Sequence, residues 1–365
     1  MAETLKGLLL SGGRGTRLRP ITHTNAKQLV PVGNKPILFY ALEALVAAGI
    51  EEIGIVTGET AAEVEAAVGD GSAFGAHCTY IHQEAPLGLA HAVLCARDFL
   101  GSSPFVMYLG DNLVRHGIVP VVEEFRALRP DAMILLARVP EPQHFGVAEL
   151  EGGRVVRLVE KPAVPRSDLA LVGVYLFTSV IFEAIERIGY SARGELEITD
   201  AIQQLIDQGR DVRSHIIGAG PEAAVATWKD TGRLEDLLEA NRIVLDDMPA
   251  RVNGHVGEDV RLEGKVVVEA GAELRKCTVR GPAIIGPGTI VEDAYVGPYT
   301  SISAHCIVRG AEIEHSIVLQ GARIEHTDGK IESSLIGRDC VIRRSPVRPS
   351  AYKLMLGDNS VVELR

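Results

Sequence analysis

The sequence contains few cysteines, and their arrangement gives no support to a disulfide framework. Five are present in 365 residues, they are widely spaced, and none forms a C-x-x-C pair: Cys78, Cys95, Cys277, Cys306 and Cys340. An odd number of scattered cysteines is typical of reduced thiols in a cytoplasmic protein. We therefore expect buried structural thiols rather than disulfides.

The sequence also lacks a long apolar run. No stretch approaches the ~20 residues that a bilayer-spanning helix needs, and the first residues, "MAETLK", pass directly into a predicted strand without a leader. We therefore expect a cytoplasmic protein with no membrane partner.

Positive charge is scarce as well. The chain has 37 Lys and Arg against 48 Asp and Glu, which gives a formal net charge of -11. No basic cluster is dense enough to follow a nucleic-acid backbone, so no nucleic-acid partner is expected. Any phosphate site must therefore be a local concentration of positive charge.

The first two-thirds of the chain alternates predicted strands and helices. Short apolar runs of the kind buried on both faces of a sheet occur at 6–11, 53–58, 105–110 and 132–137. Helical patterns lie at 34–49, 89–101, 180–189, 198–209 and 232–245, the first with Asn34 as its predicted N-cap and Pro36 in its first turn. This order predicts an α/β, Rossmann-like fold with a mainly parallel, mixed sheet and helices on both faces. Its ligand site should lie beyond the carboxyl ends of the strands.

After about Asp246 helical periodicity disappears, and small apolar residues recur at intervals of five or six. They are Ile285, Val291, Val296, Ile302, Val308, Ile313, Val318, Ile324, Ile331, Ile336 and Ile342. This spacing predicts a parallel β-helix of hexapeptide repeats. The predicted domains are therefore 1–245 and 246–365.

The predicted β-helix has three further features. The terminal "KLMLGDNSVVELR" is expected to protect its end, and the coil is expected to serve packing and homo-oligomerisation. His305, in "SISAHCIV", could act as the base of an acyltransferase, but a turn histidine is the favoured interpretation.

A glycine-rich loop follows the first predicted strand, in "LLLSGGRGTRLRP". It matches neither the dinucleotide fingerprint nor the Walker loop. Its glycine N–H groups can approach an anion closely, and Arg14, Arg17 and Arg19 add positive charge, followed by Lys27. A pyrophosphate or triphosphate is the predicted occupant, since its charge offsets the desolvation of several cations.

Carboxylates follow other predicted strands. Asp111, in "YLGDN", ends a strand, and Asp230, in "TWKDTG", precedes the last helix of this part. Single aspartates at turns are usually caps, but two that converge with phosphate oxygens would suit Mg²⁺. Glu160 and Lys161 end another strand at Pro162, where one could accept hydrogen bonds from hydroxyls and the other could bind a phosphate.

Eight ordered motifs together resemble the sugar-1-phosphate nucleotidyltransferases, in the form that carries an additional left-handed β-helix. They are "SGGRGTRLRP", "AKQLVPVGNKPI", "HQEAPLGLAHAV", "YLGDN", "FGVAEL", "VEKP", "GELEITDAI" and "WKDTG". The resemblance implies a Mg²⁺-dependent reaction of dTTP with glucose 1-phosphate, giving a nucleotide-sugar and pyrophosphate. UTP or another hexose 1-phosphate remains open, as does a non-catalytic sugar-nucleotide sensor.

The resemblance also implies site residues. Arg17 would act on the departing pyrophosphate, Lys27 near the α-phosphate, and Lys161 on the sugar phosphate. Further nucleotide contacts would come from Leu10, Gly12, Gly13, Gly15, Thr16, Gln83 and Gly88, with the last two reading the base. Asp111 and Asp230 would bind Mg²⁺. The sugar pocket would be lined by Gly146, Glu160, Leu171, Gly173, Tyr175 and Trp228.

The sequence departs from the family pattern at two places. Phe145 precedes Gly146 where the family usually has a tyrosine, so a polar contact near the sugar is missing. The stretch "IIGAGPEAAVATWKDTG" is longer than usual ahead of Trp228 and is predicted to form a surface loop that borders the site.

Overall fold

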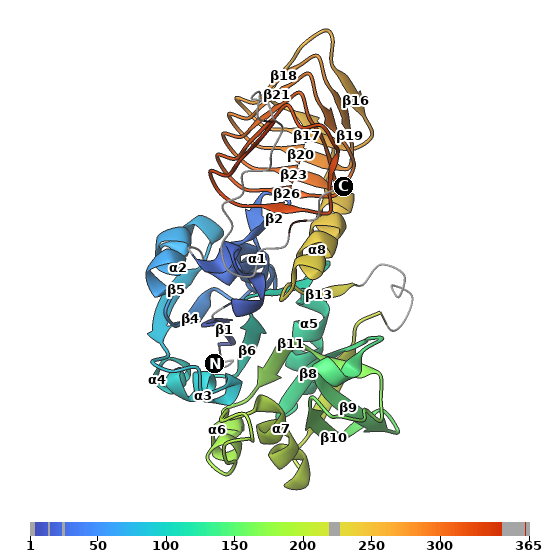
Figure 1. Cartoon of the computed structure of the whole chain (residues 1–365). Helices are drawn as coiled ribbons and strands as arrows, with labels where there is room; N and C mark the ends of the chain where they lie inside the picture. Colours follow the sequence, from blue (N-terminus) through green and yellow to red (C-terminus); the bar gives the residue numbers. More distant parts are fainter. Residues whose placement is uncertain (1–3, 14, 24–25, 219–226, 345–361, 363–365) are drawn as a thin grey trace. The chain divides into compact units, whose positions relative to one another are not determined.

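The computed structural model describes residues 4–13, 15–23, 26–218, 227–344 and 362. The chain forms two compact units (Figure 1). The first comprises Met1–Arg14, Asn25–Leu29 and Ile37–Asp230, and the second comprises Gly15–Thr24, Val30–Pro36 and Thr231–Arg365. Most of the predicted surface loop (219–226) and almost all of the predicted C-terminal cap lie outside the described residues.

The first unit is built on a nine-stranded mixed sheet. Its parallel part contains β6 (Phe105–Leu109), β1 (Lys6–Ser11), β4 (Glu52–Thr57) and β5 (His77–His82). β11 (Leu169–Phe177) joins β6 in antiparallel orientation and also pairs with β8 (Ala132–Arg138) and β9 (Gly146–Glu151). β10 (Arg154–Glu160) pairs with β9, and β12 (Val212–Ile216) with β8. The predicted strands are present to within a residue, and the predicted mixed α/β sheet is confirmed.

Helices cover both faces of this sheet, because successive side chains of a strand point to opposite sides. Leu8 and Leu10 of β1 belong to one core with α3 (Leu89–Cys95), α4 (Arg97–Leu100), α6 (Val180–Ile185) and α7 (Ile198–Asp207). Leu9 belongs to a second core with α1 (Ile37–Ala47), α2 (Ala61–Val68) and α5 (Val119–Leu128). The sheet is thus the middle layer of three.

The predicted start of the first helix is wrong. α1 begins at Ile37, whereas Lys35–Pro36 forms β3, which pairs with β2 (Pro31–Val32). Gly33 and Asn34 both have positive φ, 55° and 62°, as the two central residues of a type I′ hairpin turn require. An N-cap residue needs an extended backbone instead, so Asn34 is a hairpin residue.

The second unit contains a β-helix of three parallel sheets. One sheet contains β14 (Arg251–Val252), β17 (Val266–Val268), β20 (Ala283–Ile285), β23 (Thr300–Ile302), β26 (Ile317–Val318) and β29 (Leu335–Ile336). Another contains β15 (His255–Val256), β18 (Glu273–Arg275), β21 (Ile290–Glu292), β24 (Ile307–Arg309), β27 (Arg323–Glu325) and β30 (Val341–Arg343). The third contains β16 (Arg261–Glu263), β19 (Thr278–Arg280), β22 (Tyr295–Val296), β25 (Glu312–Glu314) and β28 (Ile331–Glu332).

The predicted apolar repeat forms the core of this coil. Eight of its residues are completely buried: Ile285, Val291, Val296, Ile302, Val308, Ile313, Val318 and Ile324. Ile342, in the last described turn of the coil, is 36% exposed. The hexapeptide repeat is therefore confirmed as the pattern that fills the coil.

Helix α8 (Leu234–Asp247) belongs to the same unit as the coil. Its Leu245 packs against Val267 and Ile284, on the outer face of one coil sheet. Its fully buried Asn241 accepts hydrogen bonds from the Gly33 N–H (2.8 Å) and the Ser301 hydroxyl (2.6 Å).

Asn241 also donates to the Tyr299 carbonyl at 3.0 Å. The β2–β3 hairpin makes a second contact with the coil, since Asn34 donates to the Ile302 carbonyl at 2.7 Å and accepts from the Ser303 hydroxyl at 3.2 Å. Helix α8, the hairpin and the coil are thereby joined by buried polar contacts.

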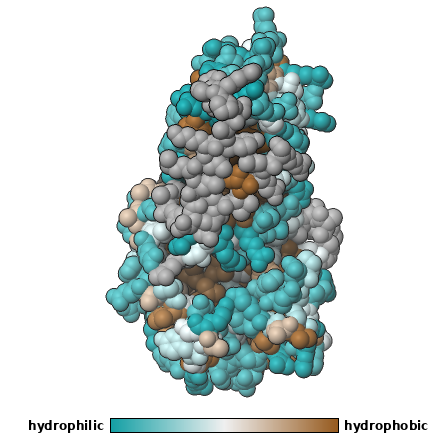
Figure 2. Space-filling view, viewed as in Figure 1, coloured by the Kyte–Doolittle hydropathy of each residue, from teal (hydrophilic) through white to brown (hydrophobic). Residues whose placement is uncertain are grey.

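The face of the molecule in Figure 2 is largely hydrophilic, with apolar side chains scattered over it. Exposed large apolar residues include Val164, Tyr190 and Val252. No helix in the described part of the chain is long and apolar enough to cross a membrane. All five cysteines are free; Cys277 and Cys306 are buried as expected, whereas Cys340 is exposed.

Replacing Asn241 with leucine should destabilise the protein by about 3 kcal/mol, because buried donors and an acceptor lose their partner. Urea unfolding of Asn241→Leu against the unchanged chain measures this. The matched control is Asn253→Leu, at an exposed position of the coil, which should change stability little. Equal effects of the two substitutions would contradict the role of Asn241.

Candidate active site

Three predicted site residues follow parallel strands of one sheet and lie at its carboxyl edge. Gly12 follows β1, Gln83 follows β5, and Asp111 follows β6. The N–H of Gly110 donates to the Leu10 carbonyl, and the N–H of Gln83 donates to the Thr57 carbonyl, each at 2.9 Å. A Cβ placed on Gly12 would lie 3.4 Å from Gln83 Oε1. The sheet therefore brings the glycine turn, Gln83 and Asp111 to one edge.

The Lys27–Asp111 ion pair is the electrostatic centre of this edge. Lys27 begins a short 3-10 helix (Lys27–Leu29), and its Nζ pairs directly with Asp111 Oδ2. Their side chains are only 8% and 21% exposed. Burial raises the pKa of Asp111, but the charge and hydrogen bond of Lys27 outweigh it and hold the pKa below its usual value. Asp111 is therefore a carboxylate at neutral pH.

Asn112, which belongs to the motif "YLGDN" but has no predicted role, connects this pair to Trp228. Its Nδ2 donates to Asp111 Oδ1 at 2.9 Å, and its Oδ1 accepts from Trp228 Nε1 at 2.5 Å. Asn112 is 3% exposed. A buried amide with both ends bound holds Asp111 in one orientation.

Two short paired strands bring Asp230 near Asp111. They are β7 (Asn112–Val114) and β13 (Trp228–Asp230), which are antiparallel, and Asp230 lies opposite Asn112. Residues directly opposite on two strands are neighbours. Asp230 thus lies opposite the residue that directly follows Asp111, a proximity that the sequence could not show.

The carboxylates of Asp111 and Asp230 fit a Mg²⁺ ion that is also bound by the phosphates of a substrate. Within the described ranges, no group of three or more His, Cys, Asp or Glu side chains could hold a metal ion. Mg²⁺ is commonly bound by one or two carboxylates together with phosphate oxygens and water. Two carboxylates, one of them already ionised by Lys27, match that requirement.

Residues predicted for the sugar side also come together. Glu160 at the end of β10 pairs in register with Gly146 at the start of β9. A Cβ on Gly146 would lie 2.8 Å from Leu171 Cδ1 and 3.2 Å from Glu160 Oε2. Burial and the negative charge of Glu160 both raise the pKa of Tyr175, so its hydroxyl stays protonated.

Glu160 has two cationic neighbours, one of which the sequence did not predict. Lys161 Nζ lies 3.3 Å from Glu160 Oε1, and Arg193 Nη2 lies 3.1 Å from the same atom. Arg193 is held by Glu197, at 2.8 Å, and directly precedes the motif "GELEITDAI". The Lys161 side chain is 46% exposed, so its ammonium can reach a ligand.

Gly173, one of the residues predicted to line the sugar pocket, closely approaches Asn112 beside the Asp111 carboxylate. It has φ +80°, and a Cβ there would lie 2.9 Å from Leu109 Cδ1 and 3.1 Å from Asn112 Nδ2. The register of β11 with β8 shifts between Leu171 and Tyr175. Only glycine tolerates this backbone and this approach without strain, so the strand irregularity makes room for Asn112.

Phe145, at the position where the family usually has a tyrosine, packs against Trp228. The two rings are 5.3 Å apart and meet edge to face. The ring is therefore used for packing.

Two polar side chains beside the glycine turn have buried atoms without a partner. Among the described residues, Ser11 Oγ and Gln28 Oε1 make no hydrogen bond. Gln28 Nε2 would lie 3.5 Å from a Cβ on Gly13. Such orphaned atoms are rare in native proteins and commonly mark a ligand or water site. Neither side chain is among the predicted site residues, although Ser11 begins "SGGRGTRLRP" and Gln28 lies in "AKQLVPVGNKPI", because the sequence does not show which polar atoms lack a partner.

The rest of the glycine-rich loop belongs to the second unit. Gly15 has φ 61°, and Thr16–Leu18 forms a 3-10 turn. The Thr22 hydroxyl donates to the Gly15 carbonyl at 2.7 Å, and Thr16 and Arg17 are exposed. Arg14 lies outside the described residues. The roles of Gly15, Thr16 and Arg17 stay predictions.

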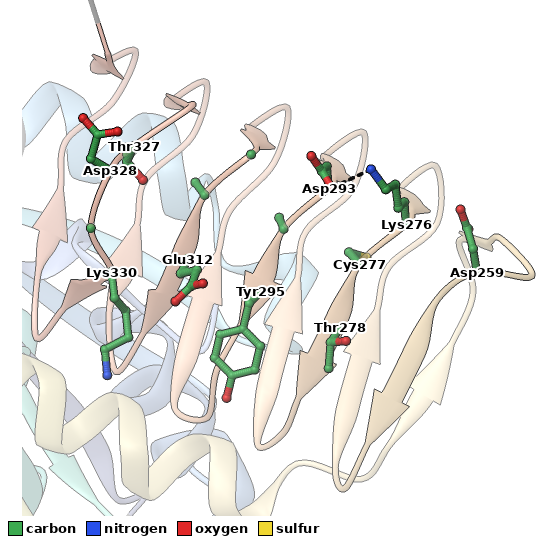
Figure 3. A pocket seen from close by; sticks show the side chains of 14 residues that line it. Asp259, Lys276, Cys277, Thr278, Asp293, Tyr295, Glu312, Thr327, Asp328 and Lys330 are labelled. Carbon is green, nitrogen blue, oxygen red and sulfur yellow. Dashed lines mark ion pairs between the residues drawn. The ribbon is translucent and has the colours of Figure 1, made fainter.

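A groove of about 600 Å³ runs along one face of the coil (Figure 3). Charged and aromatic side chains line it, among them Lys276, Asp293, Tyr295 and Lys330, and Lys276 Nζ lies 2.9 Å from Asp293 Oδ1. None of the described residues that line it is a histidine. His305 instead occupies a coil corner with φ 57° and an exposed side chain, as a turn histidine does.

The fold and the site are those of a nucleotidyltransferase, and the family model described as "Nucleotidyl transferase" matches residues 6–247. The chain is 57% identical to a glucose-1-phosphate thymidylyltransferase of Streptomyces griseus over 99% of both chains. It is 53% identical to one of Streptomyces antibioticus over 99% of this chain and 100% of the other. The chain belongs to the glucose-1-phosphate thymidylyltransferase family.

Two solved structures each resemble about two-thirds of this chain. One, described as a glucose-1-phosphate thymidylyltransferase of Bacillus anthracis in complex with a sucrose, is 35% identical with a TM-score of 0.62. It covers 68% of this chain and 98% of its own. A UDP-glucose pyrophosphorylase complexed with UDP-glucose is 26% identical with a TM-score of 0.58, over 67% and 100%.

Lys27→Met should destabilise the protein by about 3 kcal/mol at neutral pH, because it leaves Asp111 buried without its counter-ion. The lowered pKa of Asp111 means that the pair stabilises the fold above the unfolded-state pKa, and that this contribution disappears as the pH falls through the folded-state pKa. The difference in urea stability between Lys27→Met and the unchanged chain should therefore shrink in acid.

The control for this experiment is Lys276→Met, which breaks the exposed pair with Asp293 and should have little effect at any pH. A penalty for Lys27→Met that does not change with pH would contradict the assignment.

Proposed function

We propose that this chain transfers a thymidylyl group from dTTP to glucose 1-phosphate, giving dTDP-glucose and pyrophosphate, with Mg²⁺ as cofactor. The observation that carries the proposal is the Lys27–Asp111 pair at the carboxyl edge of the sheet, with Asp230 on the adjoining strand. The full-length similarity to thymidylyltransferases supports the choice of substrates.

The proposed reaction is an in-line attack of a sugar-phosphate oxygen on the α-phosphorus of the nucleotide. The attacking oxygen is already anionic at neutral pH, so the site needs no general base. It must instead hold two anions that repel each other and neutralise the charge that develops. Lys27 neutralises charge at the α-phosphate, Arg17 binds the departing pyrophosphate, and Lys161 holds the sugar phosphate.

Asp111 and Asp230 hold Mg²⁺, which when bound offsets the negative charge of the phosphates. Asn112 keeps the Asp111 carboxylate in its orientation. The remaining nucleotide contacts come from Leu10 of β1, from the loop residues Gly12, Gly13, Gly15 and Thr16, and from Gln83 and Gly88 at the base.

Glu160 is placed to accept hydrogen bonds from the sugar hydroxyls, since its contacts with Lys161 and Arg193 orient its carboxyl group. Gly146, Leu171, Gly173, Tyr175 and Trp228 would surround the sugar ring. UTP is the competing nucleotide, because uracil lacks only one methyl group and a methyl is worth ~1–3 kcal/mol in a pocket.

The decisive test is pyrophosphate release across a panel of nucleoside triphosphates and sugar 1-phosphates. The highest kcat/KM is expected for dTTP with glucose 1-phosphate, and chelation of Mg²⁺ should stop the reaction. Binding of sugar nucleotides without turnover of any pair would show a sensor instead. A higher kcat/KM for UTP would replace the proposed nucleotide.

Asp111→Asn should lower kcat at least ~100-fold at any Mg²⁺ concentration, because a neutral amide is a poor Mg²⁺ ligand and supplies no charge. The matched control is Asp98→Asn, at an exposed position of the same unit, which should keep normal activity. Near-normal turnover of Asp111→Asn would remove Asp111 from the metal site.

We further propose a cytoplasmic location, in keeping with five free cysteines, and a homo-oligomer assembled through the coil. Light scattering of the full chain measures its mass, and a monomer at enzyme concentration would exclude the oligomer.

A further inference from the structure

The amide of Gln83 is bound on one side by two groups from the following segment. Its Nε2 lies 3.3 Å from the Gly88 carbonyl oxygen and 2.9 Å from His91 Nδ1. Its Oε1 points the other way, toward Gly12, where a Cβ would lie 3.4 Å from it. The Gln83 amide thus presents its acceptor oxygen to the glycine-rich loop.

This orientation determines the tautomer of His91. A backbone carbonyl can only accept, so the NH₂ group of Gln83 must face Gly88. The same NH₂ group then donates to His91 Nδ1, which must be unprotonated, and the ring proton is on Nε2. Cys95 Sγ lies 3.7 Å from His91 Nδ1. Burial raises the pKa of Cys95, so it remains a thiol.

The segment that carries both partners of the amide is rigidly held. Gly88 has φ +107°, and a Cβ there would lie 2.4 Å from the Leu196 carbonyl oxygen. The N–H of Leu196 donates to Leu87 at 2.7 Å, and the N–H of Ala90 donates to Leu196 at 3.1 Å. Gly88 and His91, at the start of α3, therefore keep fixed positions relative to Gln83.

The orientation of the amide matters because pyrimidine bases differ in the group at N3. Thymine and uracil carry an N3–H donor, whereas cytosine has an unprotonated N3 acceptor beside an amino donor. An acceptor oxygen at Gln83 attracts the first pattern and repels the second. An amide turned by 180° would present its NH₂ group and favour cytosine.

We infer that His91 is a positioning residue that locks the Gln83 amide and thereby makes the site select thymine and uracil over cytosine. The inference rests on the proposed function, in which the Gln83 amide contacts the base of the nucleotide. His91 supplies the shorter of the two bonds to Nε2, 2.9 Å against 3.3 Å. Without it, the Gly88 carbonyl is the one remaining hydrogen-bond partner of Nε2 among the described residues.

The test compares His91→Leu and His91→Asn by kcat and KM with dTTP, dUTP and dCTP. In His91→Leu, KM for dTTP should rise about 5-fold with kcat nearly unchanged, and the dTTP/dCTP ratio of kcat/KM should fall about 10-fold. The dTTP/dUTP ratio should stay constant, because both bases carry N3–H. His91→Asn should restore much of the dTTP/dCTP ratio, since its Oδ1 can accept where Nδ1 does.

An unchanged dTTP/dCTP ratio in His91→Leu would overturn the inference, and so would an equal loss for all three nucleotides, which shows a purely structural role. His91→Phe provides a second acceptor-free variant if the leucine variant does not fold. If the unchanged chain turns over no substrate, the proposed function fails. Calorimetric titration of the same variants with dTTP and dCTP then tests the base preference by itself, with the same expected ratios.

Discussion

The interaction on which the site depends is the buried ion pair of Lys27 and Asp111. Taking both charges out of water is unfavourable unless each finds its partner, so the pair requires the segment of Lys27 to lie at the end of β6. Once Asp111 is held there, its second oxygen binds Asn112, and Asn112 binds the Trp228 indole. One electrostatic constraint thus determines which side chains gather at this edge of the sheet.

The polar contacts continue from the carboxylates to both predicted substrates. Gly173 leaves space for Asn112 on the sugar side, where Glu160 lies between Lys161 and Arg193. Gln83 and His91 lie on the base side. This arrangement suits a reaction between two anions, because its difficulty is to hold them together rather than to remove a proton.

The coil is more than an appended domain. The hairpin β2–β3 and helix α8 belong to its unit, and Asn241 is hydrogen-bonded to the hairpin, to β23 and to the residue before it. Residues Gly15–Thr24, which complete the glycine-rich loop, are part of that unit too. The chain segment with the phosphate-binding pattern is therefore divided between two structural units, which no local sequence feature indicates.

The buried strands, the apolar repeat of the coil and the place of Asp111 after β6 could be predicted from the sequence, because burial of apolar residues imposes a regular period along the chain. The hairpin at Asn34, the link from Asp111 through Asn112 to Trp228, and the contact of His91 with Gln83 became visible in the folded chain. A hydrogen bond depends on distances of a few tenths of an ångström between residues far apart in the sequence. Packing between chain segments determines those distances. The composition and residue spacing of any one segment do not encode this packing.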